Sequence, residues 1–278
     1  MKKINRRSFL AAAGLTAAAL ALTACGGSAS STASSTASSA ASSEAASTSA
    51  AAELTTVEAG KLTMATNATF PPYEMTTDAG DIEGIDVETA QAIADKLGLE
   101  LQIDDMDFDA ALLSVQQGKA DIVMAGVTVT DERKAVMDFS DSYATGIQSI
   151  IVPEGSDITS PDDLAGKKIG TQRGTTGYIY CSDDFGDDAV VAYDDGLTAV
   201  QALNNGQVDA VVIDNAPAKE FVAANPGLVI LDTSYAEEDY AIGLAKGSAL
   251  EDAVNAALEE LKADGTLQSI VDKYITAE

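Results

Sequence analysis

The sequence predicts an α/β protein with largely parallel sheets, since strand-like and helix-like segments alternate along most of the chain. The chain has 278 residues, and roughly the first 53 lack the pattern of a folded domain. The remainder, about 225 residues, suits two lobes of ordinary domain size. One helix–strand unit also occurs twice, which favours two lobes that are built alike.

Short apolar runs predict the strands, and apolar residues at helical spacing predict the helices. The expected strands are Leu62–Thr66, Leu99–Ile103, Ile122–Ala125, Lys168–Thr171, Val190–Tyr193 and Ala210–Ile213. The expected helices are Val87–Leu97, Asp109–Gln117, Leu197–Asn205 and Leu250–Ala263. Glycines stand where these helices should end, at Gly98, Gly118, Gly206 and Gly265. An apolar stripe in the last helix predicts core packing of Leu250, Val254, Ala257, Leu258 and Leu261.

The repeated unit consists of a helix, a glycine stop, an aspartate and a short apolar strand. The aspartates are Asp121 and Asp209, 88 residues apart, and each follows its glycine by three residues. The two strands end at equivalent places, Gly126 and Asp214. Ligands of open α/β sheets bind beyond the carboxyl ends of the strands. Two lobes with those ends turned inward would therefore place Gly126 and Asp214 across one cleft.

The composition excludes several classes of function. The formal net charge is -28, from 16 basic and 44 acidic residues, which indicates a solvated surface that repels nucleic acid. The chain has no histidine, so it has no histidine-based catalytic triad or metal site. We expect no metal and no cofactor. The two cysteines, Cys25 and Cys181, are not expected to pair.

The N-terminal region predicts export and anchoring. Residues 1–24 have a basic start, an apolar run and small residues before Cys25, as in a signal peptide, and the run is too short to span a membrane. Leu22–Cys25 resembles the lipobox of bacterial lipoproteins, which implies cleavage before Cys25 and a diacylglycerol on its thiol. Arg6-Arg7 leaves twin-arginine export open beside the general route. Residues 25–53, rich in Ser, Ala and Thr, predict a disordered tether, with a glycosylated stalk as the alternative.

Three segments together suit the binding of a free amino acid. Ala65–Glu74 supplies an aromatic, proline-stiffened loop, Thr128–Arg133 supplies a hydroxyl and a guanidinium, and Asp214 ends an apolar strand. A guanidinium can hold a carboxylate through two parallel hydrogen bonds, and a buried carboxylate needs a cation. The pattern therefore favours a binding protein over an enzyme. Arg133 on a helix surface and Asp214 as the cap of a helix near Pro217 are the alternative interpretations.

From about Leu62 to Tyr274 the chain resembles the family 3 extracytoplasmic solute-binding proteins, the amino-acid receptors of ABC importers. The matching stretches are F-P-P-Y-E, G-I-D-V-E-T-A-Q-A-I-A, D-F-D-A-A-L-L-S-V-Q-Q-G, V-T-V-T-D-E-R, D-F-S-D-S-Y, D-L-A-G-K-K-I-G, R-G-T-T-G and L-K-A-D-G-T. The resemblance implies the type II periplasmic-binding-protein fold, with two lobes that close around the ligand. Lobe 1 would comprise 57–145 plus 240–278 and lobe 2 149–236.

The resemblance also implies two hinge crossings, near Ala144–Gln148 and Glu238–Tyr240. A permease and an ATPase are the implied partners of a monomeric receptor that a lipid anchors outside the cytoplasm of a bacterium.

The resemblance assigns a role to each candidate site residue. Arg133 would bind the α-carboxylate and Asp214 the α-ammonium, while Thr128 would contact both groups. Gly126 would offer its carbonyl to the ammonium, its missing side chain letting the ligand approach. The remaining candidates are two aromatic residues that would enclose the ligand side chain and two residues that complete the carboxylate site from lobe 2: Phe70, Phe108, Thr175 and Thr176.

Two further positions bear on specificity. Asn67 stands where family members that bind basic or glutamine ligands often have an acid, and Gln172 with Arg173 could reach the side-chain pocket from lobe 2. Neutral polar ligands such as glutamine or cystine are therefore favoured over basic ones. Two rival functions on the same fold stay open. A dehydratase would need a general acid, for which Glu74 is the nearest spare carboxylate, and a sensor domain would be expected to continue beyond Glu278.

Overall fold

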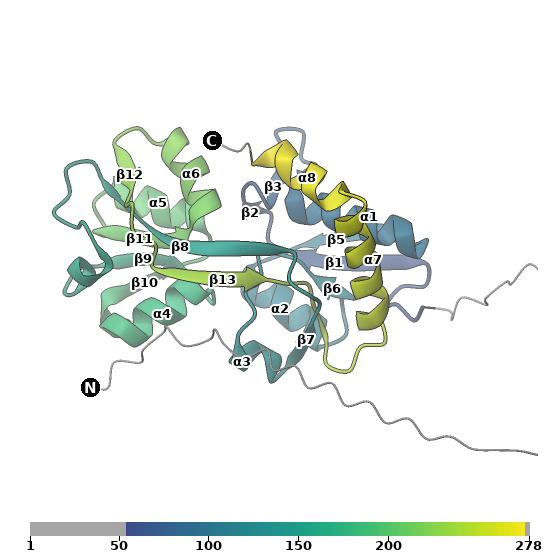
Figure 1. Ribbon diagram of the computed structural model, residues 1–278. Coiled ribbons are helices and arrows are strands. Elements are labelled where there is room, and N and C mark those ends of the chain that lie inside the picture. Colours follow the sequence, from purple (N-terminus) through teal and green to yellow (C-terminus); the bar gives the residue numbers. More distant parts are fainter. Residues whose placement is uncertain (1–53, 276–278) are drawn as a thin grey trace, which may run out of the picture. The chain divides into compact units, whose positions relative to one another are not determined.

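The computed structural model describes residues 54–275. The predicted signal peptide, the lipidated Cys25 and the tether lie outside the described residues. Among the helices that are described, none is both long and apolar enough to cross a membrane. Two sheets, each covered by helices, organise this part of the chain (Figure 1).

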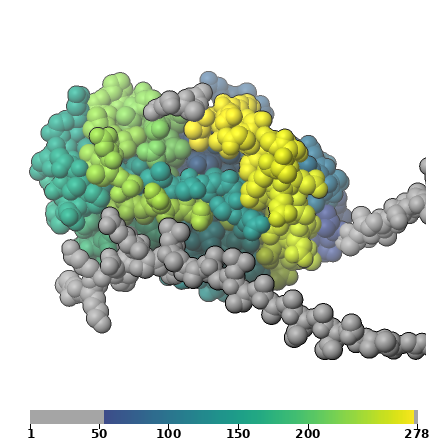
Figure 2. Space-filling model, in the orientation of Figure 1, coloured from purple at the N-terminus to yellow at the C-terminus, as the bar shows by residue number. Residues whose placement is uncertain are grey.

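The first lobe is built on a five-stranded sheet of order β5-β1-β6-β14-β7. Its strands are β1 Lys61–Thr66, β5 Glu100–Asp105, β6 Ile122–Val123, β7 Met137–Phe139 and β14 Gly243–Ala245. Its helices are α1 Ile85–Leu97, α2 Phe108–Gln116, α3 Asp131–Lys134, α7 Glu251–Ala263 and α8 Thr266–Tyr274. A small antiparallel sheet follows β1, with strands β2 Thr69–Phe70, β3 Glu74–Thr76 and β4 Ile82–Glu83. In Figure 2 the yellow surface of α7 and α8 marks this lobe on the right.

The second lobe is built on a sheet of order β10-β9-β11-β8-β12, with β13 also paired to β8. Its strands are β8 Ala144–Pro153, β9 Ile169–Gln172, β10 Val190–Tyr193, β11 Ala210–Asp214, β12 Leu228–Ile230 and β13 Ala236–Tyr240. Its helices are η1 Pro161–Leu164, α4 Thr176–Phe185, η2 Asp187–Ala189, α5 Gly196–Asn204 and α6 Asn215–Ala224.

Strands β8 and β13 run between the two lobes. They pair antiparallel from Ala144 opposite Tyr240 to Gln148 opposite Ala236, and Figure 1 shows them side by side between the two sheets. Thr128 of the first lobe forms an isolated bridge with Tyr240 at the end of this ribbon. The ribbon lies where the sequence places the two hinge crossings.

The strands and helices expected from the sequence all occur, with bounds that differ by at most two residues. The expectation of largely parallel sheets is wrong, because both sheets are mixed. β1 pairs parallel with β5 and β6, but β14 runs antiparallel to β6 and β7. In the second lobe β8 runs antiparallel to β11, β12 and β13. The antiparallel strands come from the crossings between lobes, which the helix–strand alternation does not reveal.

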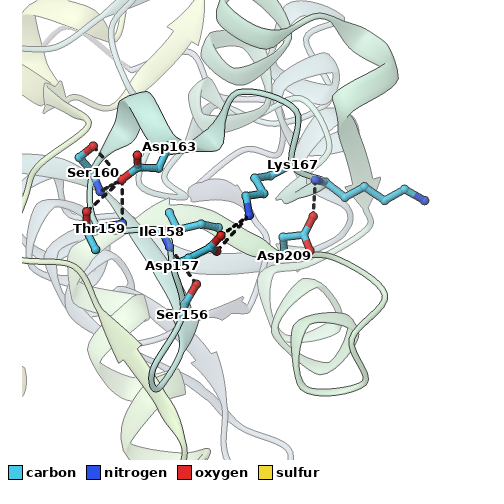
Figure 3. Close-up of polar contacts among 9 residues, drawn as sticks. Ser156, Asp157, Ile158, Thr159, Ser160, Asp163, Lys167 and Asp209 are labelled. Carbon is cyan, nitrogen blue, oxygen red and sulfur yellow. Dashed lines mark hydrogen bonds and ion pairs between the residues drawn. The ribbon is translucent and has the colours of Figure 1, made fainter.

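The aspartates of the repeated unit do the same structural work in both lobes. The Asp121 carboxylate accepts hydrogen bonds from the N–H groups of Thr63 and Val57, at 2.8 Å each, and its own N–H donates to the Thr63 carbonyl. The Asp209 carboxylate accepts from the Lys168 N–H at 2.7 Å, and its N–H donates to the Lys168 carbonyl (Figure 3). Each aspartate therefore links the start of one strand, β1 or β9, to the turn that precedes the neighbouring strand, β6 or β11.

The core of each lobe lies between its sheet and its helices. The stripe predicted in the last long helix is buried, with exposed fractions of 0–4% from Leu250 to Leu261. Cys181 is buried in the second lobe beneath β9 and β11. Gly98 ends α1 in the left-handed region, at φ 70°, as expected for a helix stop.

Candidate functional site

All ten site residues predicted from the sequence line one cavity. The first lobe supplies Asn67, Phe70, Phe108, Gly126, Thr128 and Arg133, and the second lobe supplies Gln172, Thr175, Thr176 and Asp214. Glu74 and Ala125 complete the lining. The cavity lies at the carboxyl ends of β1, β6, β9 and β11, where open α/β sheets bind ligands.

Arg133 lies inside the cavity and not on a helix surface. It belongs to the short helix α3, whose first residue is preceded by the capping hydroxyl of Thr130, and it is 8% exposed. Its Nη1 donates to the Thr128 carbonyl at 2.8 Å and its Nη2 to the Gly174 carbonyl of the second lobe at 3.2 Å. Its guanidinium lies 5.2 Å from the centre of the Phe108 ring. Burial lowers the pKa of the guanidinium, which nonetheless stays charged at neutral pH.

Asp214 stands at the end of β11 and is 8% exposed. It precedes α6, but its side chain makes no capping hydrogen bond there. Its carboxylate instead accepts from Gln148 Nε2 at 2.8 Å and from the Tyr240 hydroxyl, both on the hinge ribbon. Burial first, and then the charge of Glu238, raise the pKa of Asp214 to about 7. A cationic ligand group beside this carboxylate would therefore be strongly stabilised.

Gly126 adopts a positive φ of 54°, and its N–H donates to Asp86 Oδ2 at 3.0 Å. A Cβ at this position would lie 2.8 Å from the Phe70 ring. The missing side chain thus makes room for Phe70, and the expectation that it also lets a ligand approach stays a prediction. Asp86 is fully buried and also accepts from the Tyr143 hydroxyl at 2.8 Å. Burial raises the pKa of Asp86 to about 6, against the opposing effect of these two hydrogen bonds.

The aromatic walls come from two places in the first lobe. Phe70 stacks on Tyr73 with 5.9 Å between ring centres, and Tyr73 in turn packs edge-on against Tyr240 at 5.3 Å. Tyr73 itself does not line the cavity, so it supports Phe70 from behind. Phe108 lies at the start of α2 and carries the guanidinium of Arg133 over its ring.

Asn67 and Gln172 meet across the cleft. Gln172 Nε2 donates to Asn67 Oδ1 at 2.8 Å, and Asn67 Nδ2 donates to the Met106 carbonyl at 3.0 Å. Both side chains are buried. Arg173 does not join them: its side chain is exposed, 3.7 Å from Asp194, and lies outside the cavity lining. The expectation that Arg173 reaches this pocket is therefore wrong.

Thr175 and Thr176 begin helix α4 of the second lobe. Thr175 is the N-cap, and its hydroxyl accepts from the Tyr178 N–H at 3.4 Å. The preceding Gly174 has a positive φ of 74° and packs so closely on Asp109 that a Cβ would lie 1.8 Å from its carboxylate. The start of a helix offers free N–H groups and a positive dipole end, which suit an anion such as a carboxylate.

Glu74 is the cavity residue whose role the sequence left open. It is fully buried, and burial followed by the charge of Asp86 raises its pKa well above the usual value. Glu74 therefore carries a proton at neutral pH more readily than an exposed glutamate. The resemblance placed Gln148, Glu238 and Tyr240 at the hinge crossings but gave them no part in the site. They support the cavity from the hinge ribbon. The strand alternation of β13 could have identified two of them, since Glu238 and Tyr240 are buried on one side.

Comparison with known proteins identifies the family of the chain. The family described as "Bacterial extracellular solute-binding proteins, family 3" matches residues 62–277. A "Probable histidine-binding protein" of Neisseria gonorrhoeae is 32% identical over 283 residues, covering 99% of this chain and 98% of that protein. The "L-cystine-binding protein TcyJ" of Escherichia coli K12 is 34% identical over 226 residues, covering 80% of this chain and 85% of that protein.

A solved structure extends the comparison to the fold. "An ancestral arginine-binding protein bound to arginine" is 43% identical, with a TM-score of 0.74, and the match covers 78% of this chain and 98% of that one. The two lobes, the hinge ribbon and the cavity at the strand ends are those of the type II fold. The family match spans nearly the whole described region. The chain therefore belongs to family 3 of the bacterial extracellular solute-binding proteins.

Proposed function

We propose that the protein is an extracytoplasmic receptor that binds one free polar amino acid between its lobes and delivers it to an ABC permease. Lobe 1 then comprises 57–145 plus 240–278 and lobe 2 149–236. The observation that carries the proposal is the opposition of one buried guanidinium, Arg133, and one buried carboxylate, Asp214, in a single cavity. These groups match the two charges that every free amino acid has.

Each part of the ligand contacts a different set of cavity residues. The α-carboxylate binds Arg133 and the N–H groups at the start of α4, at Thr175 and Thr176. The α-ammonium binds Asp214 and Thr128, together with the Gly126 carbonyl. Phe70 and Phe108 enclose the side-chain stem, and Asn67 with Gln172 faces its polar end. Because this end carries amides and no ionised acid, neutral polar ligands such as glutamine or cystine are favoured over lysine or arginine.

Titration calorimetry tests the proposal. The twenty amino acids, cystine and ornithine are titrated into the purified residues 54–278. One L-amino acid should bind with a dissociation constant of roughly 0.1–10 μM, or about -7 to -10 kcal/mol. A panel that gives no heat with any of them would reject an amino-acid receptor.

Because of Glu74, an enzymatic function on the same fold is a second candidate, and it can be tested. A dehydratase needs a general acid in the cleft, and Glu74 is buried there with a raised pKa. Incubation with ring carboxylates, followed by ultraviolet absorbance for an aromatic product, distinguishes the two functions. A receptor forms no product, and its Glu74→Gln variant still binds the amino acid.

Anchoring of the receptor is part of the proposal. A signal peptide of residues 1–24 and lipidation at Cys25 would hold the folded part near the membrane through the tether of 25–53, as a monomer beside its permease and ATPase. Cys25→Ala should release the protein into the soluble fraction and abolish labelling with a radioactive fatty acid. Unchanged membrane retention and labelling would contradict the lipid anchor.

A further inference from the structure

Glu238 is a buried carboxylate on the hinge ribbon that no part of the proposed ligand contacts uses. It lies on β13, is 6% exposed and does not line the cavity. Its neighbour Glu237 points to solvent on the other face of the same strand. A buried carboxylate is costly unless donors surround it, so its partners indicate what it does.

Two of the three partners of Glu238, Thr128 and Thr176, line the cavity. Its Oε2 accepts from the Thr176 hydroxyl at 2.9 Å, from Gln148 Nε2 at 3.0 Å and from the Thr128 hydroxyl at 3.1 Å. Thr128 belongs to the first lobe and Thr176 to the second, so one oxygen ties the two walls together. Gln148 also donates to Asp214 Oδ2, which links the two carboxylates.

These contacts fix the direction of two hydroxyl groups. A carboxylate oxygen only accepts, and each hydroxyl has a single hydrogen. Thr128 and Thr176 therefore spend their hydrogens on Glu238 and keep only lone pairs for other partners. Toward the cavity, both hydroxyls are acceptors.

We propose that Glu238 is a positioning residue which, acting through the hydroxyls of Thr128 and Thr176, makes one side of the cavity selective for an ammonium group. The inference rests on the proposed function and names the residue that sets its polarity. Hydroxyl oxygens and Asp214 accept from the ammonium, while Arg133 and the N–H groups of α4 donate to the carboxylate. Because Glu238 touches both lobes, this polarity is complete only when the lobes are closed.

Two substitutions separate the hydrogen-bond acceptor of Glu238 from the size of its side chain. Glu238→Met keeps the length of the side chain but offers no acceptor, so both hydroxyls can turn their hydrogens toward the ligand. Glu238→Gln keeps one acceptor oxygen at the place of Oε2. Glu237→Met removes the exposed neighbouring carboxylate and serves as the control.

The experiment measures binding of L-glutamine, L-cystine, L-histidine and L-arginine by calorimetry, in wild type and in the Thr128→Val/Thr176→Val background. Circular dichroism and thermal unfolding verify that each variant folds. Glu238→Met should weaken the tightest-binding probe about tenfold or more, and Glu238→Gln should recover at least about threefold of that loss. In the valine background, Glu238→Met should cost less than about threefold, since the hydroxyls through which it acts are gone. Glu237→Met should bind as wild type does.

Two results would overturn the inference in different ways. Equal losses for Glu238→Met and Glu238→Gln, unchanged in the valine background, would mean that Glu238 only stabilises the hinge. If wild type binds none of the four probes, the ligand that binds tightest in the full amino-acid panel replaces them. A wild type that binds nothing in that panel refutes the proposed function, and the inference fails with it. If Glu238→Met does not fold, the comparison of Glu238→Gln in the two backgrounds decides: a loss that disappears with the hydroxyls supports the inference, and an equal loss contradicts it.

Discussion

Replacing Arg133 by methionine tests the charge opposition on which the proposed function depends. The substitution keeps a long, flexible apolar side chain over Phe108 and removes the guanidinium. Arg133 is 8% exposed, so a ligand carboxylate bound to it is desolvated and would lose its charged partner. Removing one partner of such a buried pair costs about 2–5 kcal/mol. The N–H groups at the start of α4 remain, so we expect about 3 kcal/mol, or a dissociation constant raised by about two orders of magnitude.

The stability of the ligand-free protein should change much less. The carbonyls of Thr128 and Gly174 each lose one donor, which costs about 1 kcal/mol apiece, but a desolvated charge is also removed. Burial already disfavours that charge, as the lowered pKa of the guanidinium shows. We therefore expect a net change in the free energy of unfolding within about 1 kcal/mol.

Calorimetry with the tightest-binding amino acid and with its carboxamide is the assay. Wild type should prefer the acid strongly, whereas Arg133→Met should lose most of that preference, because the guanidinium is the group that recognises the carboxylate. Lys134→Met, at the exposed next position of α3, is the matched control and should bind as wild type does. If Arg133→Met binds the acid as tightly as wild type, the assignment of the carboxylate to Arg133 is refuted.

Four other predictions follow from the cavity. Binding of the ammonium requires ionised Asp214, whose pKa is about 7, so the affinity measured by calorimetry should fall as pH falls through 7. Asp214→Asn should weaken binding and abolish this pH dependence. In the ligand-free protein the same raised pKa contributes stability that is fully present below the ordinary value near 4 and is lost as pH rises through 7. Thermal unfolding of wild type should show this loss, and Asp214→Asn should show a smaller one, because the raised pKa values of Asp86 and Glu74 remain. Asn67→Asp adds a negative charge at the side-chain end and should shift the preference toward arginine or lysine in competition titrations; an unchanged ligand order would contradict the assigned pocket. Saturating ligand should reduce the radius of gyration in small-angle scattering by favouring the closed lobes, and an identical radius with and without ligand would contradict closure.

The sequence was sufficient to predict the residues that present a charge or an aromatic ring to the cavity. Phe70 and Asp214 end strands β2 and β11, and Phe108 and Arg133 lie in the first turns of α2 and α3. The strand ends of α/β lobes converge. The groups that support the cavity could not be predicted from the sequence, because they lie on the hinge ribbon. Whether Glu238 meets Thr128 and Thr176 depends on how two lobes close on each other, which no local pattern encodes.

The antiparallel strand pairing could not be predicted for a related reason. β6, β7 and β14 are only two or three residues long, too short for a recognisable alternation. In the long β8 only residues 150–152 form an apolar run, and its direction depends on partners far along the chain, β11, β12 and β13. The space that Gly126 leaves for Phe70 could not be predicted, because Phe70 is 56 residues away in sequence.

Asp121 and Asp209 fasten each sheet at the end of the strands that faces away from the cavity. Gly126 and Asp214 follow the same strands at the other end, where the ligand is proposed to bind. Fastening and recognition are thus segregated along each strand, and a substitution at one end leaves the bonds at the other intact. This segregation makes the scaffold a suitable frame for re-engineering ligand preference by grafting the cleft loops alone.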